Sequence, residues 1–317
     1  MPATDASELL DAALAGDRRA LGRLLSYVEG GGGKAQRVAA LTFPRSASPD
    51  QVVGLTGAPG AGKSTLASGL VVEARRSGPV GVLAVDPSSP FSGGAILGDR
   101  VRMQEHAGDP GVFIRSIASR GHLGGLALAV PEAVRTLVAA GFPLVVVETV
   151  GVGQVEVAVA GAADTTVVVV TAGWGDSVQA AKAGLLEVAD VLAVNKADRP
   201  GAEQARRDLA AMLDLGPAPG GWRPPVVLTD ATAGRGLPEL WAAIRGHRRW
   251  LAETGCLEER RRARLLAEME DVLVRRLAAD ARTSHEGAVW ERVTGAVLAG
   301  RLDPASAAAE LLASVAP

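Results

Sequence analysis

The chain has 317 residues, of which 48% are hydrophobic, and its formal net charge is −2. This length accommodates one large α/β domain with helical additions, or two modest domains. The near-neutral charge gives no reason to expect a nucleic-acid partner or a membrane-binding surface. The single cysteine, Cys256, excludes an internal disulfide framework and a multi-cysteine metal site, and it fits a reducing, intracellular setting.

The chain shows no signal for secretion or for a membrane span. Its first residues, MPATDASELLDAAL, carry early acids and lack a basic region followed by a long apolar run. The longest apolar runs, such as residues 165–172, are far too short to cross a bilayer. We therefore expect a soluble cytoplasmic protein.

The first 250 residues divide by their hydrophobic pattern. Residues 5–29 predict two short amphipathic helices, and the glycine run at 30–33 predicts a flexible joint after them. From about 51 to 250, short β-branched runs alternate with helical stretches, which predicts a mainly parallel sheet with helices on both faces. In such sheets ligands bind outside the carboxyl ends of the strands, where each polar motif described below lies.

The last 67 residues predict helices only. Residues 257–280 form a long helical pattern whose apolar stripe packs either on its own domain or on a partner chain. The members of the stripe are Leu266, Met269, Leu273 and Leu277. Arginines 260, 261, 262 and 264 are interleaved with glutamates, which favours a solvated face over a nucleic-acid patch. The tail from 284 to 317 is helical again, with a predicted cap at Asp303 before Pro304.

The segment GAPGAGKST matches the phosphate-loop pattern G-x-x-x-x-G-K-[ST] at every fixed position, and it lies between a strand and a helix. Its glycines let backbone N–H groups turn toward phosphate oxygens, and the helix N-terminus adds partial positive charge. Lys63 can reach the β- and γ-phosphates, and the Ser64 hydroxyl can coordinate Mg²⁺. The predicted nucleotide contacts are Gly57, Ala58, Pro59, Gly60, Ala61, Gly62, Lys63, Ser64 and Thr65.

The segment VNKAD, which ends a later strand, indicates guanine as the base. The Asp198 carboxylate can accept from N1–H and the exocyclic amine of guanine, whereas adenine has an acceptor at N1 and no 2-amino group. The stem of Lys196 can cover the base, and Asn195 can connect this loop to the phosphate loop. After the next strand, Asp230-Ala231 occupies the place where GTPases usually have Ser-Ala, whose Ala N–H faces the guanine oxygen. Asp230 departs from that pattern.

Three acids at or just past strand ends are candidates for the metal: Asp86, Asp99 and Glu148. Mg²⁺ needs one or two carboxylates, directly or through water, because water and phosphate supply its other oxygens. Glu148 is the strongest candidate, since it ends an apolar strand before TVGVG, where the Gly151 N–H can sense a γ-phosphate. Either Asp86 or Asp99 could orient the attacking water or a metal-bound water, and the sequence does not assign these two roles between them. Asp99 can also be a helix cap.

No residue completes a hydrolytic apparatus. Gln154 can position water or simply begin the following helix. We therefore expect a slow intrinsic hydrolase of GTP to GDP and phosphate that needs a partner.

Several segments together resemble the MeaB/ArgK-type GTPases over residues 10–315. They are GAPGAGKST, AVDPSSPFSGGAILGDRVRM, VVVETVGVGQVEVAVA, GDSVQAAKAGLLEVADVLAVNKAD and TAGRGLPELW. The resemblance implies a P-loop GTPase with N-terminal helices and a C-terminal helical dimerisation arm. It divides the chain into a helical segment (1–45), a GTPase domain (46–250) and the arm (251–317).

The resemblance also implies a function. Members of this family are chaperones of adenosylcobalamin-dependent acyl-CoA mutases, most often methylmalonyl-CoA mutase, and they gate cofactor loading and protect or reactivate the enzyme. By position, Asp86, Asp99 and Glu148 match the family's metal and switch acids. Asp176 and Lys182 match an additional switch that senses the mutase, although Trp174 departs from the small residue expected there. The chain lacks the D-x-H-x-x-G pattern of a cobalamin-binding domain.

Two other functions fit the same fold. A nickel or cobalt metallochaperone GTPase would need thiolate and imidazole ligands, and one cysteine with four scattered histidines argues against it. A P-loop kinase, as the family's older name of arginine/ornithine transport kinase suggests, would need an acceptor pocket, which no segment indicates.

Overall fold

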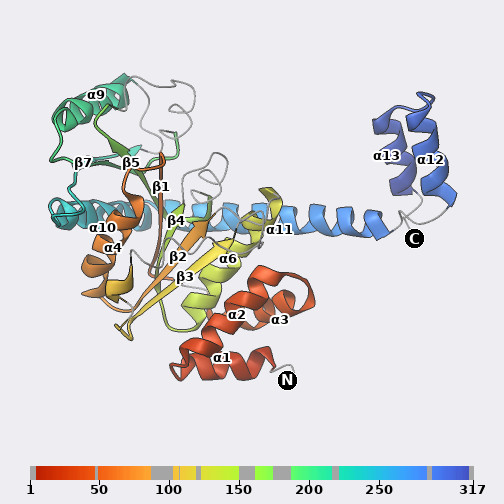
Figure 1. Cartoon of the computed structure of the whole chain (residues 1–317), viewed down its shortest axis with the longest axis horizontal. Coiled ribbons are helices and arrows are strands. Elements are labelled where there is room, and N and C mark those ends of the chain that lie inside the picture. The colour runs from red at the N-terminus through yellow and green to blue at the C-terminus, as the bar shows by residue number, and fades with distance from the viewer. Residues whose placement is uncertain are drawn as a thin grey trace. The chain divides into compact units, whose positions relative to one another are not determined.

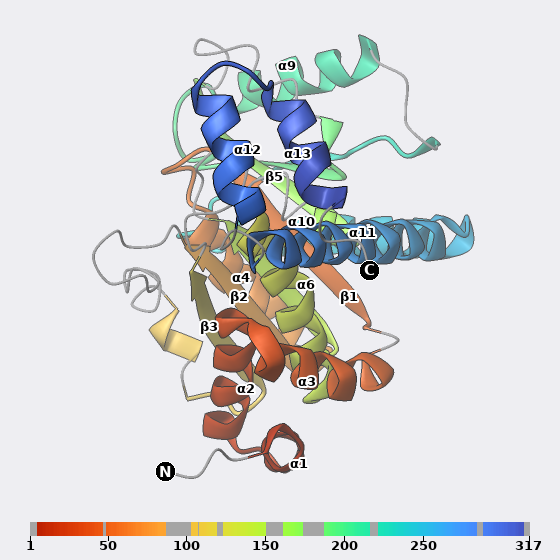
Figure 2. The same ribbon diagram turned by 90° about the vertical axis from the view of Figure 1, so that its right-hand side faces the viewer.

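The computed structural model covers the whole chain and describes residues 5–46, 49–86, 103–106, 108–118, 123–149, 161–173, 187–215, 221–283 and 288–313 (Figures 1 and 2). It divides into two compact units, residues 1–264 and 265–317. No helix among the described residues is long and apolar enough to cross a membrane.

Among the described residues of the first unit, seven strands form one sheet in the order β3-β2-β4-β1-β5-β6-β7. Every neighbouring pair is parallel, as the buried apolar runs predicted. The strands are β1 (Gln51–Gly57), β2 (Val80–Asp86), β3 (Val112–Ala118), β4 (Leu144–Thr149), β5 (Thr165–Thr171), β6 (Val191–Asn195) and β7 (Val226–Leu228).

Helices cover both faces of this sheet, and neighbouring strand residues alternate between two cores. Val52 on β1 packs with α2 and α6, whereas Val53 packs with α4 and α10 on the opposite face. Figure 1 shows α4 beside α10, and α6 beside the N-terminal helices. The helices of this unit are α1 (Ala6–Leu14), α2 (Arg18–Gly30), α3 (Gly32–Thr42), α4 (Lys63–Arg75), α6 (Leu123–Ala139), α9 (Ala202–Leu215) and α10 (Leu237–Glu253). The doubly covered parallel sheet predicted from the sequence is confirmed.

The N-terminal layer holds one helix more than the sequence predicted. α1 and α2 occupy the expected positions, but the glycine run is not a flexible joint. α2 continues to Gly30, and α3 begins at Gly32. Only Gly31 separates them, with φ of 69°. The expectation failed because glycine has low helix propensity, and here the packing of α3 on α2 and α6 outweighs that preference.

α11 (Cys256–Thr283) begins in the first unit, where its first turns pair with two buried acids. We call Asp164, Asp190, Arg260, Arg261 and Arg264 the α11 anchor. Arg260 binds both oxygens of Asp190 at 2.8 and 2.9 Å, and Arg261 and Arg264 bind Asp164 at 2.7 and 2.5 Å. Burial alone would raise the pKa of Asp164, but the two arginines lower it overall. The expectation of a solvated arginine face is therefore wrong for these three side chains.

His247 of α10 lies beside this anchor and is fully buried. Its ring packs against Trp222 and Trp250, and its Nδ1 lies 2.9 Å from the Thr165 hydroxyl. Burial lowers the pKa of His247 to about 4. The ring is therefore neutral at pH 7 and acts as a packing element.

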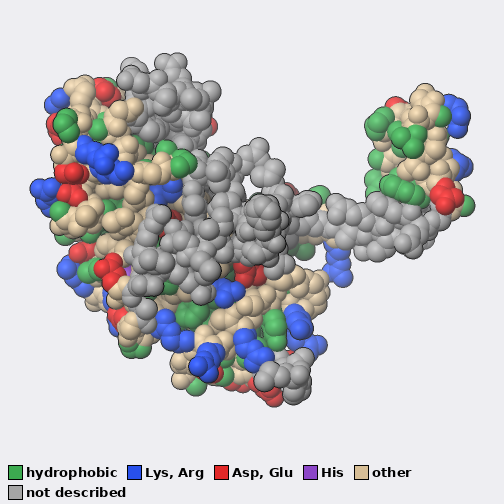
Figure 3. Space-filling model, viewed as in Figure 1, with side chains coloured by type: hydrophobic (Ala, Val, Ile, Leu, Met, Phe, Trp, Pro, Cys, Tyr) green, Lys and Arg blue, Asp and Glu red, His purple; other side chains and the backbone are tan. Residues whose placement is uncertain are grey.

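The second unit contains the remainder of α11 with α12 (Ala288–Leu298) and α13 (Pro304–Ala313). The Asp303 carboxylate accepts from the Ala305 and Ser306 N–H groups, so the predicted cap of α13 is confirmed. The predicted stripe on α11 is exposed. The exposed fractions of its residues are 47% for Leu266, 59% for Met269, 55% for Leu273 and 54% for Leu277. Figure 3 also shows hydrophobic side chains on the surface of α12 and α13.

Candidate functional site

The phosphate loop connects β1 to α4, as the motif predicted, and its glycines are required by contacts. Gly57 has φ of 138°, and a Cβ there would lie 2.1 Å from the carbonyl oxygen of Val169 on β5. Gly62 has φ of 89°, and a Cβ there would lie 2.5 Å from Nδ2 of Asn195. Because side chains are excluded at both positions, the loop can turn its N–H groups inward at the N-terminus of α4.

Lys63, the first residue of α4, is buried within this loop. Its ammonium donates to the carbonyl oxygens of Gly57 at 2.6 Å and Ala58 at 3.0 Å. The two carbonyl oxygens are neutral acceptors that keep the Lys63 ammonium at the loop. Charged phosphate oxygens would be stronger acceptors for it. Lys63 is therefore placed to exchange a carbonyl contact for a phosphate contact.

Ser64 and Glu148 meet at the mouth of the loop. The Ser64 hydroxyl donates to Oε1 of Glu148 at 2.5 Å, and Glu148 is only 1% exposed. Glu148 lies on β4, and Asp86 ends the neighbouring strand β2, so both reach the same edge of the sheet. The side chain of Asp86 lies outside the described residues, as do Asp99, Gly151, Gln154, Asp176 and Lys182.

The guanine-motif loop after β6 contacts the phosphate loop directly. Asn195 donates from Nδ2 to the Ala61 carbonyl at 2.9 Å, and its Oδ1 accepts from the Ala231 N–H at 3.2 Å. Lys196 takes a left-handed conformation with φ of 58°, and its ammonium reaches the Gly60 carbonyl at 2.7 Å. One asparagine thus connects three segments that are far apart in the sequence.

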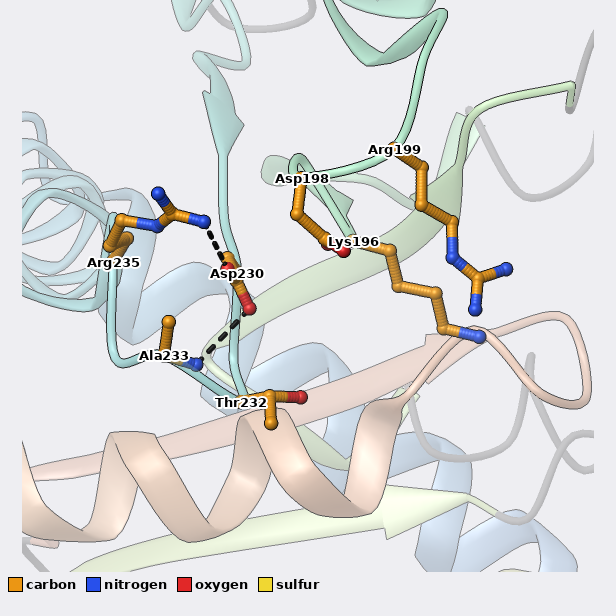
Figure 4. Close-up of a pocket in the computed structure, with 7 residues that line it drawn as sticks. All are labelled: Lys196, Asp198, Arg199, Asp230, Thr232, Ala233 and Arg235. Atoms are coloured by element: carbon orange, nitrogen blue, oxygen red, sulfur yellow. Dashed lines mark hydrogen bonds and ion pairs between the residues drawn. The ribbon is translucent and has the colours of Figure 1, made fainter.

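A pocket of about 430 Å³ opens beside this loop (Figure 4). Its lining residues are Lys196, Asp198, Arg199, Asp230, Thr232, Ala233 and Arg235. Asp198 and Asp230 come from neighbouring loops, after β6 and β7. The pocket therefore unites the predicted base-reading acid with the segment that departs from the usual Ser-Ala.

Sequence reasoning missed part of this pocket, namely Arg199, Thr232, Ala233 and Arg235. Arg235 is the most informative omission, because its guanidinium pairs with the Asp230 carboxylate at 2.6 Å. A signal was present: an arginine between two glycines, five residues after an unexpected acid. The short spacing across a glycine turn allows the two side chains to meet.

Comparison with known proteins agrees with this geometry. Residues 21–286 match the family described as "Methylmalonyl Co-A mutase-associated GTPase MeaB". The chain belongs to the MeaB family. A predicted GTPase of Pyrococcus abyssi is 46% identical over 312 residues, which cover 97% of this chain and 96% of that protein. The crystal structure of a LAO/AO transport system kinase has a TM-score of 0.70 and 27% identity, covering 98% of this chain and 97% of the other.

A third relative is a much longer fused protein, of which only a part matches this chain. The fused isobutyryl-CoA mutase of Cupriavidus metallidurans is 40% identical over 208 residues, which are 64% of this chain and 19% of that protein. The matches over nearly the whole length, together with the phosphate loop, make this MeaB-family chain a GTP hydrolase with a P-loop NTPase fold.

Proposed function

We propose that this GTPase is a chaperone of an adenosylcobalamin-dependent acyl-CoA mutase, and that it gates cofactor loading and protects or reactivates the enzyme. The association of its family with methylmalonyl-CoA mutase supports this function, as does the relative fused to isobutyryl-CoA mutase. One observation carries the nucleotide-binding part of the proposal: Asn195 bonds both Ala61 of the phosphate loop and Ala231, whose neighbours Asp230 and Thr232 line the base pocket. A single guanine nucleotide can therefore bridge the two halves of the site.

The guanine base would lie in the pocket with its N1–H and 2-amino groups toward Asp198. Asp198 is exposed at the pocket wall, and the stem of Lys196 crosses from there to the Gly60 carbonyl. The triphosphate would extend along the N–H groups of the loop to Lys63. The phosphates would then face N–H groups and the Lys63 ammonium, and the donors of the base would face the Asp198 carboxylate.

The residues present fit Mg²⁺. The Ser64 hydroxyl and the buried Glu148 carboxylate already touch, and both are the hard oxygen donors that this ion prefers. They would hold it directly or through water, with Asp86 and Asp99 as the further acids. Bound Mg²⁺ would supply positive charge that offsets the negative charge of the phosphates during hydrolysis. Ser64 lies in the first turn of α4, so the helix would orient it toward the phosphates.

The switching elements are assigned by position in the sequence. Gly151 follows Glu148 closely, and we assign it to sensing the γ-phosphate. Asp176 and Lys182 are assigned to sensing the mutase. These assignments support a cycle in which GTP orders the loops and hydrolysis releases them.

We further propose that the protein is a homodimer formed through the second unit. Within that unit, Leu266, Met269, Leu273 and Leu277 present an exposed apolar stripe at helical spacing. Such a stripe on a long helix is typical of a buried helix–helix interface.

The test of this function uses the purified chain with purified methylmalonyl-CoA or isobutyryl-CoA mutase. We expect one of them to raise the rate of inorganic phosphate release from GTP, and to co-purify with the chain when a non-hydrolysable GTP analogue is present. In Lys182→Ala the ratio of mutase-stimulated to basal hydrolysis should fall. The proposal fails if no acyl-CoA mutase changes the rate, or if phosphate appears on arginine or protein instead of in solution.

A further inference from the structure

Two carboxylates line one pocket that is proposed to read guanine. Asp198 accepts the donors of the base, whereas Asp230 directly precedes Ala231, whose N–H faces the edge with the 6-oxo group in the usual GTPase arrangement. A free carboxylate on that edge is an acceptor only. It would repel the guanine oxygen and attract the 6-amino group of adenine.

The structure shows both carboxylate oxygens of Asp230 hydrogen-bonded within its own turn (Figure 4). Its Oδ1 accepts from the Ala233 N–H at 3.1 Å, and its Oδ2 accepts from Nη2 of Arg235 at 2.6 Å. Two backbone bonds between Asp230 and Arg235, at 2.9 and 3.1 Å, close the same turn. The Arg235 hydrogen bond, followed by that of Ala233, lowers the pKa of Asp230. The carboxylate is therefore charged, and each of its oxygens accepts one hydrogen bond within the turn.

Glycine places the arginine for this contact. Gly236 has φ of 74°, and a Cβ there would lie 2.0 Å from the Leu228 carbonyl oxygen. The chain can therefore turn back tightly over the end of β7, which brings Arg235 opposite Asp230. The Asp230 side chain is 9% exposed, while that of Arg235 is 69% exposed. The acid is thus nearly buried, whereas the arginine that pairs with it is mostly exposed to solvent.

We propose that Arg235 determines base specificity by holding Asp230 away from the 6-position of the purine. The pair replaces the serine usual at position 230, and Arg235 acts through Asp230 as a positioning residue. The same guanidinium is attracted to Asp198, which raises the pKa of Arg235 after the larger effect of Asp230. One arginine thus reduces the mutual repulsion of the two acids. The inference rests on the proposed base-reading role of Asp198.

The experiment measures dissociation constants for GDP, ADP and the diphosphate of 2,6-diaminopurine riboside by calorimetry on the full chain. In Arg235→Ala, we expect the dissociation constant for ADP divided by that for GDP to fall about tenfold. The dissociation constant for the diaminopurine nucleotide divided by that for GDP should fall by a similar factor. Arg235→Gln, which removes the charge and keeps a polar side chain, should show the same direction. Because Arg235 is mostly exposed, both variants should fold.

Two further variants make the inference falsifiable. Asp230→Ser combined with Arg235→Ala removes the acid as well, and should restore both ratios to within about threefold of the parent. Arg249→Ala is the control, because it removes an exposed arginine of α10 that does not line the pocket; its ratios should stay unchanged. Unchanged ratios in Arg235→Ala, or a double variant as poor as the single one, would overturn the inference. A purely structural turn would instead weaken all three nucleotides equally.

The failure of this inference can be distinguished from failure of the proposed base reading. IDP lacks the 2-amino group, so Asp198→Asn should reduce the preference for GDP over IDP. If the parent does not prefer GDP to ADP or IDP, the role of Asp198 fails. If that preference holds and only the Arg235 variants behave like the parent, the inference about Arg235 fails alone.

Discussion

The α11 anchor gives a sharp stability prediction for Arg261→Met. The Asp164 side chain is 0% exposed and accepts from the Val52 N–H, from Arg264, and from Nε and Nη2 of Arg261 at 3.2 and 2.7 Å. Hydrogen bonds to a charged group contribute about 1.5–3 kcal/mol each. Loss of one partner of a buried ion pair costs about 3–5 kcal/mol. Because Arg264 and Val52 remain, we expect a loss near the lower limit, about 3 kcal/mol.

Urea denaturation and thermal unfolding followed by circular dichroism measure this loss. At pH 7 the melting temperature should fall by about 5 °C. The matched control is Arg262→Met, one position along the same helix at an exposed site, where the change in unfolding free energy should stay within about 0.5 kcal/mol.

The pH dependence provides a second measurement on the same pair. The folded-state pKa of Asp164 is lowered, so its ion pair stabilises the fold above the unfolded-state pKa of about 3.9 and is lost as pH falls through the folded-state value. The difference between parent and Arg261→Met should be constant from about pH 5 to 8 and shrink at lower pH. A difference equal to that of Arg262→Met at pH 7, or one that grows in acid, would refute the reasoning.

Three further predictions concern the nucleotide, the metal and the dimer. Lys63→Ala removes the cation of the phosphate loop and should weaken GTP binding about a hundredfold by calorimetry; parent-like affinity would contradict the role of the loop. Glu148→Gln should raise the Mg²⁺ concentration for half-maximal GTP hydrolysis about tenfold or more, and an unchanged requirement would exclude it as the metal-side acid. Leu273→Asp should halve the mass found by sedimentation, whereas Asp271→Ala, on the opposite face of α11, should not. Equal masses for the parent and Leu273→Asp would contradict an interface at the stripe.

The sequence predicted the sheet and the phosphate loop because both depend on local patterns. Apolar runs such as β5 can be buried on both faces only in a covered parallel sheet. The loop needs consecutive residues, Gly57 to Ser64, and its chemistry is contained within them. Asn195 was placed correctly as well, because strand and motif together fix which edge of the sheet it occupies.

The α11 anchor was missed because its contacts join residues far apart in the chain. Arg261 and Asp164 are separated by 97 positions, and an arginine among glutamates looks the same whether it faces water or a buried acid. α3 was missed for a different reason. Its glycines have low helix propensity, and only the tertiary contacts of α3 with α2 and α6 favour the helix.

The anchor and the base pocket lie at opposite ends of the same strand. Asp190 directly precedes β6, and Asn195 ends it five residues later, with β5 and β7 paired on either side. Every residue of β6 is buried, so the strand has little freedom to shift its register. The position of Asn195 is therefore set by the sheet, whereas the orientation of Asp230 is set by its own turn with Arg235. It follows that substitutions at the anchor should change the stability of the protein, and substitutions at the turn should change its choice of base.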